Sequence, residues 1–217
     1  MIMDQNKICF IMCTNNTQYA EEAIYYINNL NVPRGYSIDV LTVGGADSMT
    51  AGYNEAMKTS DAKYKVYMHQ DVMIIEKYFI HKLIKIFQDE TIGMIGMVGS
   101  PKLPENKVMW KGYRVGKIFA NNIYSMNMID YGQVEGDYCQ VQAVDGLLMA
   151  TQYDLPWRDD IFDKWDFYDV SQSLEFGKAG YKVVVPNMLK PWCIHDDGLM
   201  DLTNYYGERR KLIKEYF

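Results

Sequence analysis

Residues 63–74 read KYKVYMHQDVMI, and this stretch decides the kind of fold to expect. Tyr64, Val66 and Met68 alternate with Lys65 and Tyr67, which is the period-two pattern of a β-strand. An imidazole, an amide and a carboxylate then follow in succession as His69-Gln70-Asp71, before apolar residues resume. We therefore predict a strand over residues 65–69 that ends in a cluster of ionisable side chains.

The residues on either side of this strand alternate between strand and helix patterns. Short apolar runs predict further strands over residues 7–13, 37–43 and 92–98. Helical periodicity predicts helices over residues 19–30 and 77–89, and residues 48–58 predict a loop followed by a short helix. This alternation predicts an α/β fold with a mostly parallel central sheet flanked by helices, in which ligands bind beyond the carboxyl ends of the strands.

The second half of the chain has a different character. Residues 108–122 predict irregular hairpins, and residues 141–150 predict a strand interrupted at Asp145-Gly146. A helix over residues 167–180 with Gly180 as its C-terminal cap and a strand over residues 181–186 are expected next. Since no linker or low-complexity segment divides the chain, we expect residues 1–217 to form a single domain.

Composition limits the classes of function. The chain has 217 residues, 48% of them apolar, and a formal net charge of −6, which argues against a general nucleic-acid partner. No apolar run reaches the roughly 18–20 residues of a transmembrane helix. Four scattered cysteines favour a reduced, cytoplasmic location. The basic, amphipathic tail (residues 205–217) predicts a surface helix packed on the domain, with peripheral contact to an anionic membrane as the alternative.

His69 and Asp71 are candidate metal ligands because they flank one residue and can converge as the chain leaves the strand. His195, in the WCIHDDG segment after the last predicted strand, is a third candidate. Oxygen ligands suit Mg²⁺ and Mn²⁺, and an added imidazole favours Mn²⁺ or a heavier ion. A surface turn with a hydrogen-bonded carboxylate is the alternative interpretation.

The order of several motifs resembles that of a known family: ICFIMCTNN, SMTAGYNEAM, YMHQDV, VDGLLMA, FYDVSQSLEFGKAGYKVVV and IHDDG. Together they resemble the family 2 glycosyltransferases of GT-A fold, most closely a small subgroup named after a streptomycin-biosynthesis protein. The resemblance runs from about Lys7 to Gly198. It implies a GT-A domain that uses a nucleotide-sugar donor and a divalent metal, Mn²⁺ or Mg²⁺.

The resemblance also implies roles for individual residues. His69 and Asp71 stand where the family has its acidic D-x-D-like motif, which holds the metal, and His195 matches a late histidine that completes the metal shell. Asp169 matches the general base of inverting transfer, with Tyr168 in place of the usual glutamate. The arginine that follows in that family helix is absent here.

Other candidates lie at predicted strand ends. We expect Thr14, Asn15, Asp47 and Ser48 to contact the base and ribose of a nucleotide, or else to cap helices and turns. Asn54 matches the asparagine before the donor-site helix of the family, and Asp145 is expected to contact the sugar or the acceptor.

Together these features predict a metal-assisted, inverting glycosyltransferase that moves a sugar, with a UDP-sugar as the expected donor, to a hydroxyl of a glycan or other acceptor. Two alternatives stay open. One is a nucleotidyltransferase, although no Gly-rich loop with Arg and Lys follows the first strand. The other is a degenerate GT-A domain that binds nucleotide or glycan without catalysis.

Overall fold

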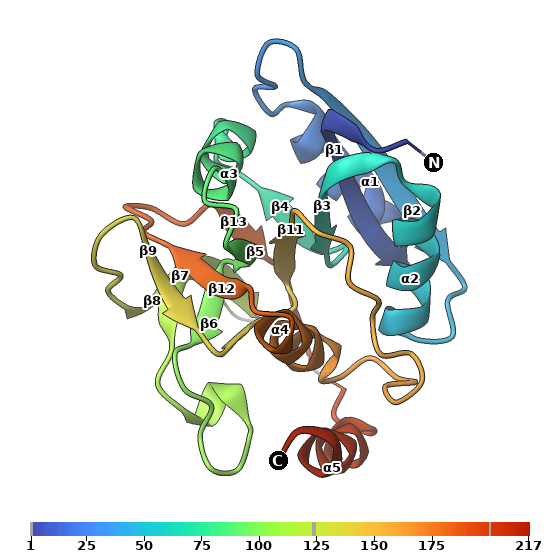
Figure 1. The fold of residues 1–217 in the computed structure, drawn as a ribbon, viewed down its shortest axis with the longest axis vertical. Coiled ribbons are helices and arrows are strands. Elements are labelled where there is room, and N and C mark those ends of the chain that lie inside the picture. The colour runs from blue at the N-terminus through green and yellow to red at the C-terminus, as the bar shows by residue number, and fades with distance from the viewer. Residues whose placement is uncertain (1, 123–124, 200) are drawn as a thin grey trace.

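The computed structural model describes residues 2–122, 125–199 and 201–217, which form two β-sheets and five α-helices (Figure 1). The larger sheet contains β1 (Asp4–Thr14), β2 (Ser37–Gly44), β3 (Ala62–Met68), β5 (Ile92–Gly96), β9 (Tyr138–Val141), β11 (Leu148–Thr151) and β12 (Lys182–Pro186). The smaller contains β4 (Val72–Ile74), β6 (Val98–Ser100), β7 (Val115–Asn122), β8 (Ser125–Gly132), β10 (Ala143–Val144) and β13 (Cys193–His195). The helices are α1 (Thr17–Asn28), α2 (Met49–Thr59), α3 (Phe79–Phe87), α4 (Tyr168–Lys178) and α5 (Tyr205–Tyr216).

The larger sheet is built around β1, whose residues from Ile8 to Met12 are fully buried. Its strand order is β2-β1-β3-β11-β5-β12-β9. β1 pairs in parallel with both β2 and β3, so the carboxyl ends of these strands meet at one edge. The predicted α/β arrangement and the position of the polar strand ends are therefore confirmed.

The expectation of a mostly parallel sheet is only partly confirmed, because both sheets are mixed. β11 lies antiparallel between β3 and β5, and β9 is antiparallel to β12. The physical reason lies in the connections, since parallel neighbours need a long crossover whereas turns and hairpins reverse the chain. Between β5 and α4 the described residues contain one short 3₁₀ turn (Met109–Lys111) and otherwise strands and loops.

The smaller sheet has the order β10-β6-β7-β13-β4, with β8 paired to β7. The single strand expected over residues 92–98 is wrong, because β5 and β6 belong to different sheets. The interruption at Asp145-Gly146 is confirmed, and there too the chain passes from one sheet to the other, from β10 to β11. The irregular hairpins expected over residues 108–122 are only partly confirmed, because this range contains a 3₁₀ turn and the single strand β7, whose hairpin partner β8 lies beyond it.

The helices begin and end close to their predicted limits. The side chain of Asn16 caps α1 by accepting hydrogen bonds from Gln18 N and Tyr19 N, and Ser48 caps α2 by accepting from Ala51 N. Gly180, with φ of 88°, follows α4 in the left-handed conformation that favours glycine. α2 packs on β1 and β2, while α4 contacts β5, β10 and β12.

The tail forms α5, which lies at one end of the molecule beside the C-terminus (Figure 1). Its Tyr205 and Leu212 are buried in a second apolar cluster with Phe162, Phe167 and Val170. The predicted surface helix packed on the domain is therefore confirmed. None of the helices in the described residues combines the length and the apolar character that crossing a bilayer requires. The four cysteines are free thiols.

Candidate active site

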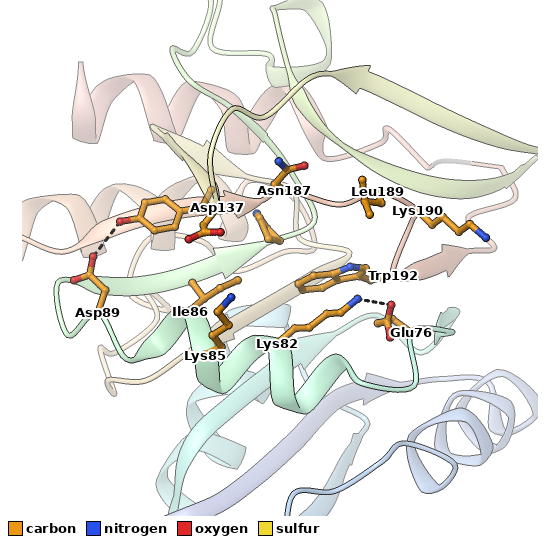
Figure 2. Close-up of a pocket in the computed structure, with 12 residues that line it drawn as sticks. Glu76, Lys82, Lys85, Ile86, Asp89, Asp137, Asn187, Leu189, Lys190 and Trp192 are labelled. Atoms are coloured by element: carbon orange, nitrogen blue, oxygen red, sulfur yellow. Dashed lines mark hydrogen bonds and ion pairs between the residues drawn. The ribbon is translucent and has the colours of Figure 1, made fainter.

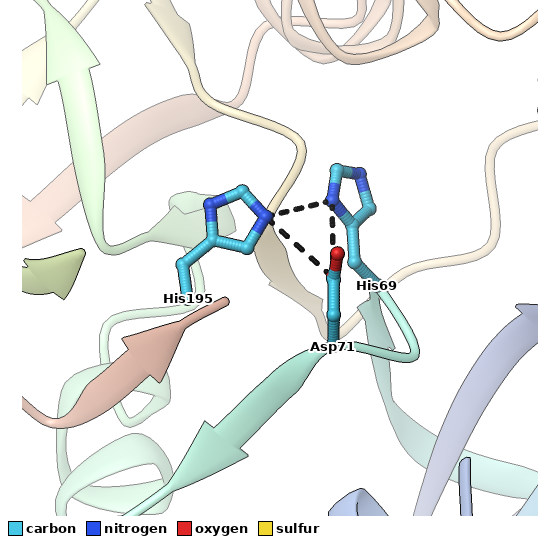
Figure 3. Close-up of side chains that lie close together, drawn as sticks. All are labelled: His69, Asp71 and His195. Atoms are coloured by element: carbon cyan, nitrogen blue, oxygen red, sulfur yellow. Dashed lines mark hydrogen bonds and ion pairs between the residues drawn. The ribbon is translucent and has the colours of Figure 1, made fainter. Parts of the chain in front are cut away.

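His69, Asp71 and His195 converge on one point at the carboxyl edge of the larger sheet (Figure 3). His69 follows β3 directly, and β13 pairs with β4 so that His195 lies opposite Val72, the neighbour of Asp71. His69 Nδ1 lies 3.3 Å from His195 Nε2, and Asp71 Oδ1 lies 3.9 Å and 3.6 Å from these two nitrogens. The loop after β3 and the end of β13, far apart in sequence, thus present three donor atoms to a common centre.

The donor atoms fit a divalent cation. Asp71 Oδ1 is buried and accepts no hydrogen bond, since both imidazole nitrogens lie too far away for one. A buried carboxylate oxygen without a partner is costly, and a cation would satisfy it. One carboxylate with two imidazoles suits Mn²⁺ better than Mg²⁺, which prefers oxygen ligands. Within the described parts of the chain, this is the one group of three such side chains close enough to share an ion.

The electrostatics of His69 and Asp71 agree with this use, whereas the Asp71 carboxylate outweighs the effect of burial and raises the pKa of His195. Burial, together with the nearby His195, lowers the pKa of His69 to about 4. Burial alone would raise the pKa of Asp71, but His195 and His69 outweigh it and the pKa of Asp71 is lowered. At neutral pH His69 is therefore neutral with a lone pair available, and Asp71 is ionised, as ligands to a cation must be.

The hydroxyl of Tyr168 helps to fix the orientation of the His69 ring. Its hydroxyl lies within hydrogen-bond distance of His69 Nε2, whereas His195 lies near the other ring nitrogen, Nδ1. When His69 Nε2 carries the ring proton and donates a hydrogen bond to the Tyr168 hydroxyl, Nδ1 is the nitrogen left free to coordinate a metal. An outer partner of this kind fixes the tautomer and rotation of metal-binding histidines.

Asp169 lies at the beginning of α4 and is held by backbone amides. Its Oδ2 accepts from Gly146 N at 2.9 Å and its Oδ1 accepts from Val170 N at 2.8 Å. Burial, followed by the negative charge of Asp145, raises the pKa of Asp169 to about 7. A carboxylate with a pKa near neutrality is suited to accept a proton during a reaction.

One pocket of about 470 Å³ brings these groups together. Its wall includes His69, Asp71 and His195, and also Asp145 and Asp169. Asp145 belongs to the turn between β10 and β11, where its Oδ1 accepts from Leu147 N and the carbonyl of Leu147 accepts from His69 N. The turn therefore connects the carboxylate pair directly to the histidine loop.

The other predicted residues lie outside the wall of this pocket. Asn54 is buried, and its amide makes two hydrogen bonds to the backbone of Trp157. Ser48 caps α2, and Asp47 beside it is exposed. Thr14 ends β1, and Asn15 follows it on the surface. Contacts of these residues with a nucleotide stay predictions.

Asn15 is nevertheless connected to the histidine loop through Gln70. Gln70 Oε1 accepts hydrogen bonds from Asn15 N at 3.0 Å and from Asn16 N at 2.9 Å. Gln70 Nε2 donates in return to Asn15 Oδ1. The turn after β1 and the turn after β3 are thus held together by the residue between His69 and Asp71.

Sequence reasoning missed Arg114, which lines the same pocket. Its guanidinium lies 4.0 Å from the ring centroid of Tyr131, also a wall residue. Among the described residues that line the pocket, it is the one Lys or Arg. Arg114 falls within the stretch expected to be irregular hairpins, and nothing in its sequence context marked it.

A second cavity of about 630 Å³ lies between α3 and residues 186–192 (Figure 2), and its lining does not include His69, Asp71 or His195. Lys82 on α3 is paired there with Glu76 at 2.5 Å, and Tyr138 donates to Asp89 at 3.0 Å. Trp192 is buried in its wall, with its ring edge-on to that of Phe79. Histidine is absent from the described residues lining this cavity, and we assign no chemistry to it.

Comparison with known proteins is in keeping with this geometry. The model of a family described as "Glycosyltransferase like family" matches residues 9–216, nearly the whole chain. The chain belongs to this glycosyltransferase-like family. A search of curated proteins gave no match.

Solved structures of low sequence identity show the same fold. One is the mannosyltransferase PcManGT from Pyrobaculum calidifontis in complex with GDP-Man and Mn²⁺, which is 14% identical with a TM-score of 0.57. The match covers 95% of this chain and 61% of the PcManGT chain. S. aureus TarS is 9% identical with a TM-score of 0.58, covering 96% of this chain and 39% of its own. The chain therefore spans less than two thirds of the length of either. These matches confirm the predicted GT-A fold.

Proposed function

We propose that this member of the glycosyltransferase-like family transfers a sugar from a nucleoside diphosphate sugar to an acceptor hydroxyl, with a divalent metal and with inversion. One observation carries the proposal: a cluster of two histidines and an aspartate shares a pocket with Asp169, a carboxylate with a pKa of about 7. The streptomycin-related subgroup, the cytoplasmic location and the absence of a nucleic-acid partner stay predictions that accompany it.

His69, Asp71 and His195 would hold the metal, which when bound stabilises negative charge on the departing diphosphate. Asp169 takes the proton of the acceptor hydroxyl as its oxygen attacks the anomeric carbon, and the bond from that carbon to the diphosphate breaks. Attack from the face opposite the leaving group inverts the anomeric centre. Asp145 lines the same pocket and would accept a hydrogen bond from a hydroxyl of the sugar or acceptor.

Arg114 offers a replacement for the missing arginine of the family helix. The pocket wall contains the carboxylates of Asp71, Asp145 and Asp169, so a diphosphate would need positive charge to enter. Arg114 supplies a cation from the position before β7 rather than from α4, and guanidinium groups bind phosphate oxygens in pairs. We therefore include Arg114 as a diphosphate contact.

The donor is expected to be a UDP-sugar, and a GDP-sugar is the second candidate because the neighbour PcManGT holds GDP-Man. Of the alternative functions, a nucleotidyltransferase has no support in the family match. A degenerate domain would keep nucleotide binding but would lack turnover, so the experiment must separate binding from catalysis.

The test is calorimetric titration of the protein with UDP, GDP and dTDP, each with and without Mn²⁺. We expect one nucleotide to bind in a Mn²⁺-dependent manner and Asp71→Ala to abolish that binding. Asp159→Ala, at an exposed aspartate outside the pocket wall, is the matched control and should bind normally. Failure of all three nucleotides to bind would refute the donor site, and binding without hydrolysis of the matching nucleotide-sugars would favour the degenerate domain.

A further inference from the structure

Two of the four tryptophans lie at the surface of the active-site pocket. Trp110 is 40% exposed and Trp165 is 46% exposed, and both line the pocket that contains Asp169. Trp157 and Trp192, by contrast, are buried in the core. Exposing two large indole rings to water within one pocket is unfavourable unless a ligand covers them.

The ring of Trp110 is held in position by packing. It stacks on Tyr205 of α5, with ring centroids 4.7 Å apart and an interplanar angle of 28°. Tyr205 is buried and lies against Phe167, with centroids 4.7 Å apart. A rigid ring loses little conformational entropy when a ligand stacks on it, so Trp110 is preorganised as a platform.

The aromatic residues of this pocket wall, Trp110, Trp165, Phe167 and Tyr205, include two that lie just before the proposed general base Asp169 in the sequence. Phe167 precedes Tyr168 and Asp169, the residues that begin α4, and Trp165 lies four residues before Asp169. Tyr205 therefore connects Trp110, through Phe167, to the segment that carries the base. A ligand resting on the tryptophans lies in the pocket that also holds the reacting groups.

The chemistry of the wall fits a pyranose ring. The C–H face of a sugar is apolar and stacks on an indole, while its hydroxyls need hydrogen-bond acceptors at the ring edge. Asp166 and Asp197, both half-buried, line the same pocket and supply carboxylate oxygens. A flexible alkyl chain would use the tryptophans but would leave these carboxylates unpaired.

We propose that Trp110 and Trp165 form an acceptor subsite for a pyranose, so that the acceptor of the reaction is itself a saccharide. Only the assignment of the bound sugar as the acceptor of the reaction rests on the proposed function. It differs from a nucleobase site because the residues expected to hold the base and ribose, such as Asn15, lie outside this wall. Binding of a sugar here requires neither a donor nor turnover, so it can be measured separately.

The experiment is saturation-transfer NMR with a panel of methyl α- and β-pyranosides of glucose, galactose, mannose and N-acetylglucosamine. We expect at least one glycoside to bind saturably, and Trp110→Ala and Trp165→Ala each to weaken its binding about tenfold. Trp110→Phe, which keeps an aromatic face, should lose much less. Tyr78→Ala, at an exposed aromatic residue outside this pocket, is the control and should bind as the unsubstituted protein does.

Titration of the same proteins with the Mn²⁺–nucleotide complex separates the possible outcomes. Intact nucleotide binding in both tryptophan variants, with loss of glycoside binding, supports the subsite. Weakened nucleotide binding with unchanged glycoside binding would overturn the subsite and assign Trp110 and Trp165 to binding of the nucleobase. Absence of any glycoside binding in a protein that binds nucleotide would also overturn it. Absence of nucleotide binding alone would count against the proposed function and leave the sugar subsite standing.

Discussion

The hydroxyl of Tyr168 occupies the space in which residue 146 would carry a side chain, because a Cβ built on Gly146 would overlap Tyr168 Oη. The same hydroxyl is the partner of His69 Nε2. Glycine at position 146 thus lets the β10–β11 turn close over Tyr168 while Tyr168 reaches the histidine. The absence of a side chain at Gly146 is therefore linked to the orientation of His69, which lies on a different loop.

Gly146→Ala should therefore weaken metal binding without unfolding the protein. The added methyl group would displace the Tyr168 hydroxyl and release His69 from its rotamer, and losing such an outer partner costs about 10–100-fold in metal affinity. Tyr168→Phe should give a loss toward the lower end of that range. Calorimetric titration with Mn²⁺ measures both. Gly177→Ala, where a Cβ meets open space on α4, is the matched control; if it weakened Mn²⁺ binding equally, the explanation through Tyr168 would fail.

Asp169→Asn should reduce turnover about 10²–10⁴-fold while leaving Mn²⁺–nucleotide binding unchanged, because an amide cannot accept the proton. The same substitution should stabilise the fold at pH 8. The pKa of Asp169 rises from 3.8 in the unfolded chain to about 7 in the fold, so its ionisation lowers stability as pH rises through that interval. After the loss of one backbone hydrogen bond, a net gain of about 1 kcal/mol, or about 2–4 °C in Tm, is expected. A variant with full turnover would remove Asp169 from the reaction.

The pH dependence of turnover should report the same carboxylate. We expect the rate to fall as pH decreases below about 7, since protonated Asp169 cannot act as a base. Asp145→Asn removes the negative charge that helps to raise the pKa of Asp169, so the acidic limb should move to lower pH. The amide oxygen of the substituted side chain can still accept from Leu147 N, which preserves the turn. A profile of kcat against pH for both proteins decides this, and an unshifted limb in the variant would separate Asp145 from the titration.

Arg114→Ala should weaken binding of the Mn²⁺–nucleotide complex about tenfold, because the pocket loses its guanidinium contact to the diphosphate. Arg114→Lys should recover part of the loss, since a lysine keeps the charge but cannot bind two oxygens in one plane or stack on Tyr131. Arg34→Ala, at an exposed loop position, provides the control. Equal affinities for the nucleoside in the unsubstituted protein and all three variants would confirm that Arg114 acts on the phosphates.

Local pattern was sufficient to predict most elements of the first half of the fold, but not the division of residues 92–98 between two sheets. The strand ending at Met68 and the helices before and after it follow from apolar periodicity and caps such as Asn16 and Ser48. The meeting of His69, Asp71 and His195 followed from the rule that ligands gather at strand ends, together with a family resemblance. The strands and helices are features that short segments specify by themselves, whereas the meeting of His195 with His69 joins segments far apart in the sequence and was expected from the resemblance.

What the sequence could not supply were relationships between distant segments. The antiparallel place of β11 between β3 and β5 depends on a turn at Asp145-Gly146 whose direction periodicity does not reveal. Arg114 and Trp165 enter the pocket only because β7 and the segment before α4 are brought together in space. Asn54 has a family match, but only the structure shows its amide committed to the backbone of Trp157.

We expect the hydrogen bonds of Gln70 to link two proposed binding events, that of a nucleotide at Asn15 and that of a metal at His69 and Asp71. A ligand that binds Asn15 would disturb the hydrogen bonds between Asn15 and the side-chain amide of Gln70. Gln70 lies in the loop between His69 and Asp71. Occupancy at one turn then changes affinity at the other, and reciprocity requires the effect to be equal in both directions. Gln70 would in this sense be a coupling element between the two proposed sites, and Gln70→Ala should let nucleotide and metal bind independently of each other.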